Sequence, residues 1–183
     1  MNNLKLKDYL LLTNDENKEL IKLRNSDEIR QVSLTQNIIT LDEHLLWLNK
    51  LKNDKTKQYF AVIYNDNVLG GVNVFDIDLQ VKWGVFFSNK TPLMIKSIIP
   101  ICFMDYIFNT LRCEKLYAEI KKLNINAISY NKNLGFEVVQ DKNIVTMELN
   151  KSRYLKAKDG MILKRIVRKM SLYNLKMEIA NEK

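Results

Sequence analysis

Alternating apolar and polar residues mark four segments in the first half of the chain as strands. These segments are residues 4–11, 59–64, 69–76 and 80–87. The second and third are predicted to form a hairpin, because Asn65-Asp66-Asn67 between them has the composition of a turn. The pattern therefore predicts a sheet that begins near the N-terminus.

Apolar residues spaced three and four apart predict helices between these strands. Two of these helices cover residues 16–24 and 41–51. A longer helix is expected from Pro92 to about Thr110, with Thr91 as its cap and Pro92 in the first helical position. Pro100 lies inside this helix and is expected to kink it, since proline has no N–H to donate.

The segment from Lys115 to Leu149 predicts a strand, a helix, and two more strands. Asn124 is expected to cap the helix, and Gly135 to end it in the left-handed conformation. Because a long helix separates the strand that ends near residue 87 from the next one, these two strands are expected to be parallel. The predicted fold class is α/β, more narrowly α+β, with one mixed, mostly antiparallel sheet flanked by helices.

The composition is typical of a globular protein. Of 183 residues, 46% are hydrophobic and 27% are charged. The longest apolar run, Ile98–Met104, is much shorter than the ~20 residues of a membrane span. Cys102 and Cys113 lie outside any CxxC pattern, and no signal peptide is recognisable. A reduced cytoplasmic protein without a metal site is therefore expected.

Positive charge is concentrated in residues 151–183. This segment holds 10 Lys and Arg against 3 Asp and Glu, whereas residues 1–150 hold 19 against 18. From Met161 to Met177 the apolar residues follow one helical face, and four cations lie opposite: Lys164, Arg165, Arg168 and Lys169. We expect a catalytic or binding domain over 1–150 and a basic amphipathic helical extension over 151–183.

A basic amphipathic helix suits more than one partner. Residues 161–177 are typical of a membrane-surface element, which would place the protein peripherally at the inner membrane face. The same pattern also suits packing against the domain itself or against the second subunit of a homodimer. Nucleic-acid binding is not expected, because no aromatic stripe or recognition motif accompanies the charge.

The run Asn124-x-x-Ala127, followed by Leu134-Gly135-Phe136, resembles the GNAT acyltransferase superfamily, and the resemblance covers about residues 4–150. It implies transfer of an acyl group from acetyl-CoA to an amine. Blocks containing Arg24-Asn25 and Glu43-His44 resemble, more narrowly, the N-acetyltransferases of pseudaminic acid biosynthesis. Those enzymes acetylate the 4-amino group of a UDP-linked amino-deoxy sugar. Ribosomal-protein and polyamine acetyltransferases share some of this block.

The resemblance also implies where acetyl-CoA binds. Backbone groups of the strand before the long helix would bond the acyl and pantetheine parts, and the start of that helix would hold the pyrophosphate. The matching positions are Val85, Phe86, Phe87, Lys90, Met94, Ile95, Lys96 and Asn124. The turn over residues 88–96 contains no glycine, whereas the turn in the family is glycine-rich.

Three side chains are implied in the chemistry. Glu119 matches the candidate base of the family, and the alternative is a sheet residue paired with Lys82 or Lys121. The tyrosine acid of the family falls on Asn131, and Tyr130 is one residue early, which on a helix is a rotation of about 100°. Both Tyr130 and Asn131 are candidates for contacting the leaving thiolate.

Acceptor binding is implied at Arg24, Asn25 and His44, which is the only histidine. The planar guanidinium of Arg24 suits a diphosphate. The alternatives are a structural ion pair for Arg24 and a solvated helix position for His44. The predicted function is acetylation of a UDP- or dTDP-linked amino sugar in surface glycan synthesis. The alternatives are a polyamine or peptide N-terminal acetyltransferase, or a catalytically weak binding module.

Overall fold

The computed structural model describes residues 2–180, which form one sheet with eight strands. The strands are β1 (Asn2–Asp8), β2 (Lys57–Tyr64), β3 (Asn67–Phe75), β4 (Lys82–Phe87), β5 (Lys115–Lys121), β6 (Glu137–Asp141), β7 (Ile144–Asn150) and β8 (Tyr173–Glu178). Their order is β6-β7-β5-β4-β3-β2-β1-β8, and only β4–β5 and β1–β8 are parallel among the described strands. The predicted mixed, mostly antiparallel sheet is confirmed.

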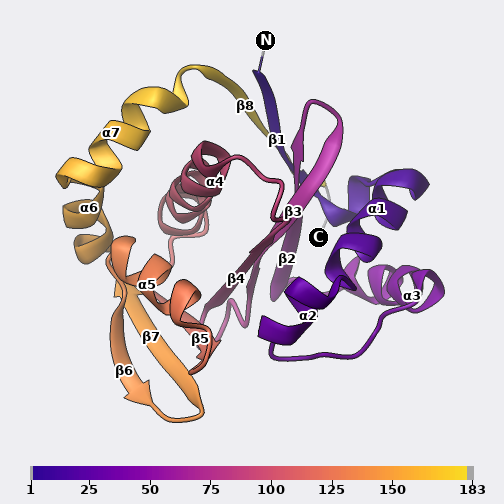
Figure 1. The fold of residues 1–183 in the computed structure, drawn as a ribbon, viewed down its shortest axis with the longest axis horizontal. Coiled ribbons are helices and arrows are strands. Elements are labelled where there is room, and N and C mark those ends of the chain that lie inside the picture. The colour runs from indigo at the N-terminus through magenta and orange to yellow at the C-terminus, as the bar shows by residue number, and fades with distance from the viewer. Residues whose placement is uncertain (1, 181–183) are drawn as a thin grey trace.

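Helices cover both faces of the sheet (Figure 1). They are α1 (Asn14–Arg24), α2 (Asp27–Val32), α3 (Leu41–Leu51), α4 (Leu93–Asp105), α5 (Ile125–Asn133), α6 (Lys151–Asp159) and α7 (Met161–Met170), with a 3₁₀ turn η1 (Tyr9–Leu11) and a π-helical segment η2 (Tyr106–Thr110). Helices α1, α2 and α3 lie on one side of the sheet. Helix α4 lies on the other side, and α6 and α7 curve around its outer surface (Figure 1).

Side-chain alternation along β2 separates two hydrophobic cores. Phe60 and Val62 belong to the core that contains α4, and Ala61 and Ile63 belong to the core that contains α1 and α3. All four side chains are buried. The larger core therefore lies between the sheet and α4, and the smaller one lies beneath α1 and α3.

The long helix differs from its prediction at both ends. Pro92 is the residue before α4 rather than its first helical residue. The Thr91 hydroxyl donates to the Leu69 carbonyl (2.9 Å) and does not cap the helix. Helix α4 ends at Asp105, and η2 continues it to Thr110 with wider turns.

The first strand and the helix after α1 also differ from the prediction. Strand β1 ends at Asp8 instead of Leu11, because the Asp8 carboxylate accepts the Leu10 N–H (3.0 Å) and begins η1. Helix α2 (Asp27–Val32) was not predicted, and it contributes one buried side chain, Ile29, at 5% exposure. A six-residue helix offers too short a run for its spacing to be recognised.

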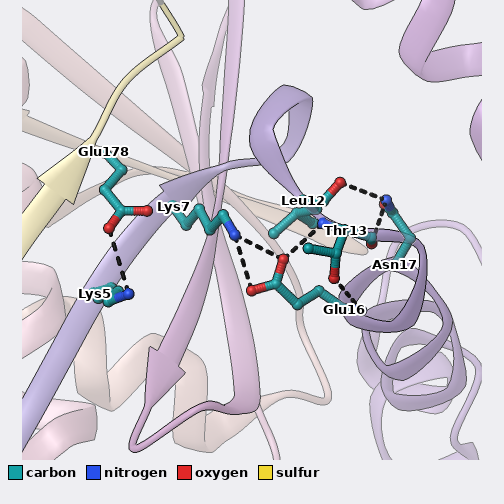
Figure 2. Close-up of polar contacts among 7 residues, drawn as sticks. All are labelled: Lys5, Lys7, Leu12, Thr13, Glu16, Asn17 and Glu178. Atoms are coloured by element: carbon teal, nitrogen blue, oxygen red, sulfur yellow. Dashed lines mark hydrogen bonds and ion pairs between the residues drawn. The ribbon is translucent and has the colours of Figure 1, made fainter.

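The predicted C-terminal helix over residues 161–177 is wrong beyond Met170. The chain there forms β8, which pairs in parallel with β1, and the Lys5–Glu178 ion pair (3.5 Å) joins the two strands (Figure 2). In β8 the apolar residues alternate, which suits a strand as well as it suits one helical face. The open edge of β1 decides between them, because pairing there satisfies backbone groups that would otherwise remain unpaired.

Most of the apolar side of α7 is covered by the domain, although Ile162 is 68% exposed. Leu163 is 5% exposed, and Ile166, Val167 and Met170 pack against the main core. The amphipathic pattern of the extension is therefore explained by packing against α4. Its opposite side, with the four predicted cations, is exposed.

A buried polar cluster fixes α6 to α4. The hydroxyl of Tyr154, which is 1% exposed, donates to the Asp105 carboxylate (2.9 Å) and also lies 3.0 Å from the Ile101 carbonyl. The Lys158 ammonium contacts both Asp105 oxygens at 2.6 and 2.7 Å. The ion pair and the hydroxyl together satisfy the carboxylate, so α6 docks in one orientation.

One described segment, Leu93–Thr110, is long and apolar enough to resemble a membrane span, with a mean hydropathy of 1.3 over 18 residues. It comprises α4 and η2, and 56% of it is buried inside the fold. Its apolar side chains are thus the core of the domain.

Candidate active site

A cleft of about 850 Å³ runs between β4, β5, α5 and the helices α1–α3. Most of the predicted site residues line it: Arg24, His44, Val85, Phe86, Phe87, Lys96, Glu119, Asn124, Tyr130 and Asn131. Four others do not line it: Asn25, Lys90, Met94 and Ile95. The fold therefore brings together residues that are up to about a hundred positions apart in the sequence.

The cleft exists because β4 and β5 diverge. Among the described residues the two strands are paired at one position, Lys82 opposite Tyr117. The Ser88 N–H donates to the carbonyl of Leu69 in β3 (2.8 Å), and the residues of β3 and β4 pair without a register shift. Backbone groups alternate sides along a strand, so Val85 directs its amide into the gap toward β5.

The same alternation corrects part of the prediction for β4. Phe87, like Val85, has its backbone N–H and C=O on the side of the gap, whereas those of Phe86 face β3. Phe86 therefore contributes its ring to the cleft wall and not its amide. A cofactor that lies in the gap finds unpaired strand groups at Val85 and Phe87.

The start of α4 has free backbone donors despite the missing glycines. Pro92 cannot cap the helix, and the amides of Leu93, Met94 and Ile95 have no acceptor within residues 2–180. The Leu93 side chain is 81% exposed and the Ile95 side chain is fully buried. Since neither side chain has to lie over the amides, the bulky residues in this turn leave the helix start able to bind an anion.

Helix α5 begins and ends as the sequence predicts. The Asn124 side chain accepts the Ala127 N–H (3.1 Å), and Gly135 has a φ of +99° after the last turn. Asn124 thus caps α5 at the mouth of the cleft. Its carboxamide is held beside the space between β4 and β5.

Asn131 and Tyr130 both have structural partners. Asn131 is 4% exposed; its carbonyl accepts the Trp83 indole N–H (3.2 Å), and its amide donates to the Ala127 carbonyl (2.8 Å). The Tyr130 hydroxyl donates to the Lys96 carbonyl (2.6 Å), and burial raises the pKa of Tyr130 far above its ordinary value. The assignment of either residue as an acid stays a prediction, and these bonds favour structural roles.

Glu119 lies on the β5 wall of the cleft. Its carboxylate is 3.0 Å from the Lys82 ammonium, which also lies 3.8 Å from Asp76. The Lys82 partner matches one of the alternatives weighed for Glu119, a paired residue of the sheet. Its side chain is still 32% exposed, so a substrate or solvent water can reach it.

His44 is buried and fixed by Asn17. Its Nε2 lies 2.9 Å from the Asn17 Oδ1. The Asn17 amide donates to the Leu12 and Thr13 carbonyls at 3.4 and 3.0 Å (Figure 2), so its oxygen faces the histidine. His44 must therefore donate from Nε2, and burial lowers its pKa. The solvated position considered for His44 is wrong, because the residue is 4% exposed.

Arg24 and Asn25 have different surroundings. Arg24 donates through Nη2 to the Thr35 carbonyl (2.9 Å) and hydroxyl (3.1 Å), while its buried Nη1 has no partner in the described part of the chain. Burial lowers the pKa of Arg24, and the charge of Arg30 lowers it further. Asn25 bonds both backbone groups of Ile39 (2.7 and 3.0 Å), so it holds the loop before α3 and both polar atoms of its carboxamide are engaged there.

A model of the acetyltransferase (GNAT) domain matches residues 11–151. The chain belongs to the GNAT acetyltransferase family. The matched segment contains the strands from β2 to β7 and the helices from α1 to α5, so the family predicted from the sequence is confirmed. The extension that contains α7 and β8 lies outside the match.

Individual GNAT relatives agree with this assignment. The acetyltransferase PseH of Campylobacter jejuni strain 81-176 is 26% identical over 150 residues, which cover 81% of this chain and 95% of that protein. The crystal structure of Campylobacter jejuni PseH with acetyl coenzyme A has a TM-score of 0.65 at 24% identity, covering 81% of this chain and 99% of that one. The chain is a distant homologue of PseH.

Two further GNAT structures share the fold but act on different acceptors. FdhC, described as a nucleotide-linked sugar GNAT, has a TM-score of 0.68 at 19% identity and covers 86% of this chain and 90% of its own. The spermidine N-acetyltransferase of Vibrio cholerae, solved with CoA and spermine, has a TM-score of 0.71 at 18% identity, with coverages of 84% and 98%. The fold alone therefore leaves the acceptor class open.

Several residues of the acceptor side were missed in the sequence. Tyr9, Trp47 and Tyr59 form an aromatic wall next to His44, with the Trp47 and Tyr59 rings 4.8 Å apart at 90°. Trp47 shares the helical face of His44, which is a recognisable signal. Tyr9 had no such signal in the sequence, because it was predicted to lie inside a strand rather than in η1.

Among residues 2–180 no cluster of His, Cys, Asp and Glu could hold a metal.

Proposed function

We propose that this GNAT protein transfers an acetyl group from acetyl-CoA to the amine of a nucleotide-linked amino-deoxy sugar. One observation carries the proposal: a single cleft, which Lys96 of α4 also lines, contains the open backbone groups of β4 and the buried, unpartnered Nη1 of Arg24. Donors at one end suit coenzyme A. A cation with a free N–H at the other suits an acceptor that carries phosphate.

Acetyl-CoA fits the first end of the cleft. The uncapped amides of Leu93, Met94 and Ile95 would bind the pyrophosphate, and the exposed Lys90 beside them adds positive charge. The pantetheine arm would follow the gap, where Val85 and Phe87 offer the hydrogen bonds of an added strand. These contacts depend on the backbone, so they tolerate the side chains that depart from the family pattern.

The chemistry needs few side chains. The amine nitrogen attacks the thioester carbonyl carbon, the C–S bond breaks, and the nitrogen loses one proton. The Val85 N–H would bind the carbonyl oxygen as negative charge develops on it. Glu119, 32% exposed on the opposite wall, would accept the proton directly or through solvent water.

The charge of the acceptor side favours a nucleotide sugar over a polyamine. The charge of Arg30 lies close enough to Arg24 to lower the pKa of Arg24, and two neighbouring cations repel a polycation. Besides Glu119, two carboxylates, Glu28 and Glu43, line the same cleft and favour the second candidate, a polyamine. Glu43, however, is bonded to the Thr40 N–H and hydroxyl in the capping box of α3. Glu28, by contrast, has no hydrogen-bond or ion-pair partner among residues 2–180.

A thiol-release assay separates these candidates. The acceptors are UDP- and dTDP-linked 4-amino sugars, spermidine and a peptide with a free N-terminus. We expect release with a nucleotide sugar, and Arg24→Ala should raise the KM for it at least about tenfold, the loss of one charged hydrogen bond. Lys22→Ala, an exposed cation of the same helix, is the matched control. Turnover of spermidine alone would favour the polyamine candidate.

Acetyl-CoA binding tests the third candidate, a fold that has lost catalysis. Calorimetry with the folded protein should give a micromolar Kd, equivalent to about −8 kcal/mol. Binding without release from any acceptor would support a binding module. The absence of both would contradict the enzyme proposal.

The extension has a separate proposed role in location. Lys164, Arg165, Arg168 and Lys169 are exposed and have no carboxylate partner within residues 2–180. Their charge suits the anionic inner face of a cell membrane, at about 1 kcal/mol per cation. Sedimentation with vesicles that contain phosphatidylserine tests this. Changing the four residues to Gln should abolish binding, and equal binding of both proteins would remove the membrane interpretation.

A further inference from the structure

Helix α4 has a carbonyl group that its own backbone cannot satisfy. Pro100 is buried inside the helix and has no N–H. The Lys96 carbonyl, four residues earlier, therefore lacks the backbone N–H donor that it would have in a regular helix. A carbonyl at such a part-buried position is destabilising without a donor, so a donor from elsewhere is expected.

Helix α5 supplies that donor. The Tyr130 hydroxyl lies 2.6 Å from the Lys96 carbonyl, a short hydrogen bond between the two helices. The Tyr130 ring packs against the main core, and burial raises its pKa, so the proton stays on the oxygen. The hydroxyl replaces the N–H that Pro100 cannot provide.

The bond joins the two walls of the cofactor end of the cleft. The Lys96 N–H donates to the Pro92 carbonyl (3.1 Å), which is the first backbone hydrogen bond of α4. The three residues directly before Lys96 carry the uncapped amides. Tyr130 lies on α5, whose cap, Asn124, is at the mouth of the same cleft. A single hydrogen bond thus sets the start of α4 relative to α5.

We propose that Tyr130 is a positioning residue for acetyl-CoA. Its hydroxyl holds the free amides at the start of α4 at a fixed place, and it donates no proton in the reaction. The hydrogen bond between Tyr130 and Lys96 does not depend on the proposed function. The effect of this bond on acetyl-CoA binding does rest on the proposed function. The carbonyl left open by Pro100 gives the reason for a tyrosine at this position.

Substitution of both residues tests the proposal as a cycle. Tyr130→Phe removes the hydroxyl, and Pro100→Ala returns an N–H to the helix, which bonds the Lys96 carbonyl without help from α5. In the wild-type background we expect Y130F to weaken acetyl-CoA binding about tenfold, equivalent to about 1.4 kcal/mol. The melting temperature should fall by about 3 °C. In the P100A background the same change should cost less than about twofold, because the carbonyl already has a donor.

The pH dependence of kcat provides a second readout. A positioning residue leaves the profile of Y130F parallel to that of the wild type, whereas loss of an acid removes its alkaline limb. Pro100→Val returns the same N–H and replaces P100A if that variant does not fold.

Two results would overturn the proposal. One is an equal loss from Y130F in both backgrounds. The other is a hundredfold fall in kcat with acetyl-CoA affinity unchanged, which would make Tyr130 a catalytic residue. If the wild type binds no acetyl-CoA, the proposed function fails instead, and the melting-temperature cycle still decides whether the hydroxyl replaces the missing N–H.

Discussion

Replacing Leu93 by proline deletes one backbone N–H from the proposed pyrophosphate site and little else. Leu93 is the first residue of α4, a position that proline favours because its fixed φ suits the helix start. The preceding residue, Pro92, has φ −55° and ψ 139°, which is the extended conformation that a residue before proline prefers. The Leu93 side chain is 81% exposed, so its loss removes almost no packing.

The expected cost falls on the cofactor and not on the fold. A hydrogen bond to a charged group contributes about 1.5–3 kcal/mol, so L93P should weaken acetyl-CoA binding by about ten- to a hundredfold. The free energy of unfolding should remain within about 0.5 kcal/mol of the wild type, since the substitution also restricts the unfolded chain. Calorimetry with acetyl-CoA and urea unfolding measure the two quantities.

Leu93→Ala is the matched control, because it removes the same side chain and keeps the N–H. The reasoning predicts that L93A binds acetyl-CoA as the wild type does. Equal affinity of L93P and L93A, from proteins of equal stability, would refute it. The amide would then point away from the cofactor, and the departure from the glycine-rich turn would have removed the site.

Three other predictions concern the extension, the buried histidine and the proton donor. Tyr154→Phe removes the hydroxyl that Asp105 accepts, so urea unfolding should show a loss of about 1–3 kcal/mol; an unchanged midpoint would mean that the cluster does not hold α6. Burial lowers the pKa of His44 below 6.5, so the wild type should lose stability as the pH falls from about 6.5 to about 5, and His44→Gln should show a flatter dependence. The kcat should stay level between about pH 8 and about pH 9.5, because Tyr130 and Asn131 are both bonded to structural partners; a decline there would reveal a side-chain acid.

The parts of the fold that could be predicted are those fixed by local chemistry. The Asn124 cap and the left-handed Gly135 each depend on residues within a few positions, and both are found where the sequence places them. The prediction for the segment after Met170 was wrong because its structure depends on a distant part of the chain. Its apolar spacing fits a helical face and a strand alike, and the partner that decides, β1, lies at the other end of the chain.

The site was predictable where the backbone sets it and less so where single side chains do. Val85 follows from the divergence of two strands, which belongs to the fold. Asn25 was assigned to the substrate, but its carboxamide bonds Ile39 across an irregular loop that no spacing describes. The aromatic wall at Trp47 and Tyr59 likewise depends on a helix and a strand meeting over the sheet. The position of a motif indicates which surface forms the candidate site. Which side chains on that surface have a free hydrogen-bonding group is known only from their contacts in the structure.

The reaction does not require a dedicated acid, and this explains how the chain can lack the tyrosine of its family. Attack leaves the amine nitrogen with one proton too many, and cleavage of the C–S bond leaves a thiolate with one too few. The two requirements balance, so in the proposed reaction a proton relayed by solvent water beside Glu119 would complete the transfer. The carboxamide of Asn131 is then free to bond the Trp83 indole and the Ala127 carbonyl. Asn131, which fixes α5 against β4, thus stands where the family has a proton donor. We expect this exchange to slow protonation of the thiolate and to leave the fold unchanged.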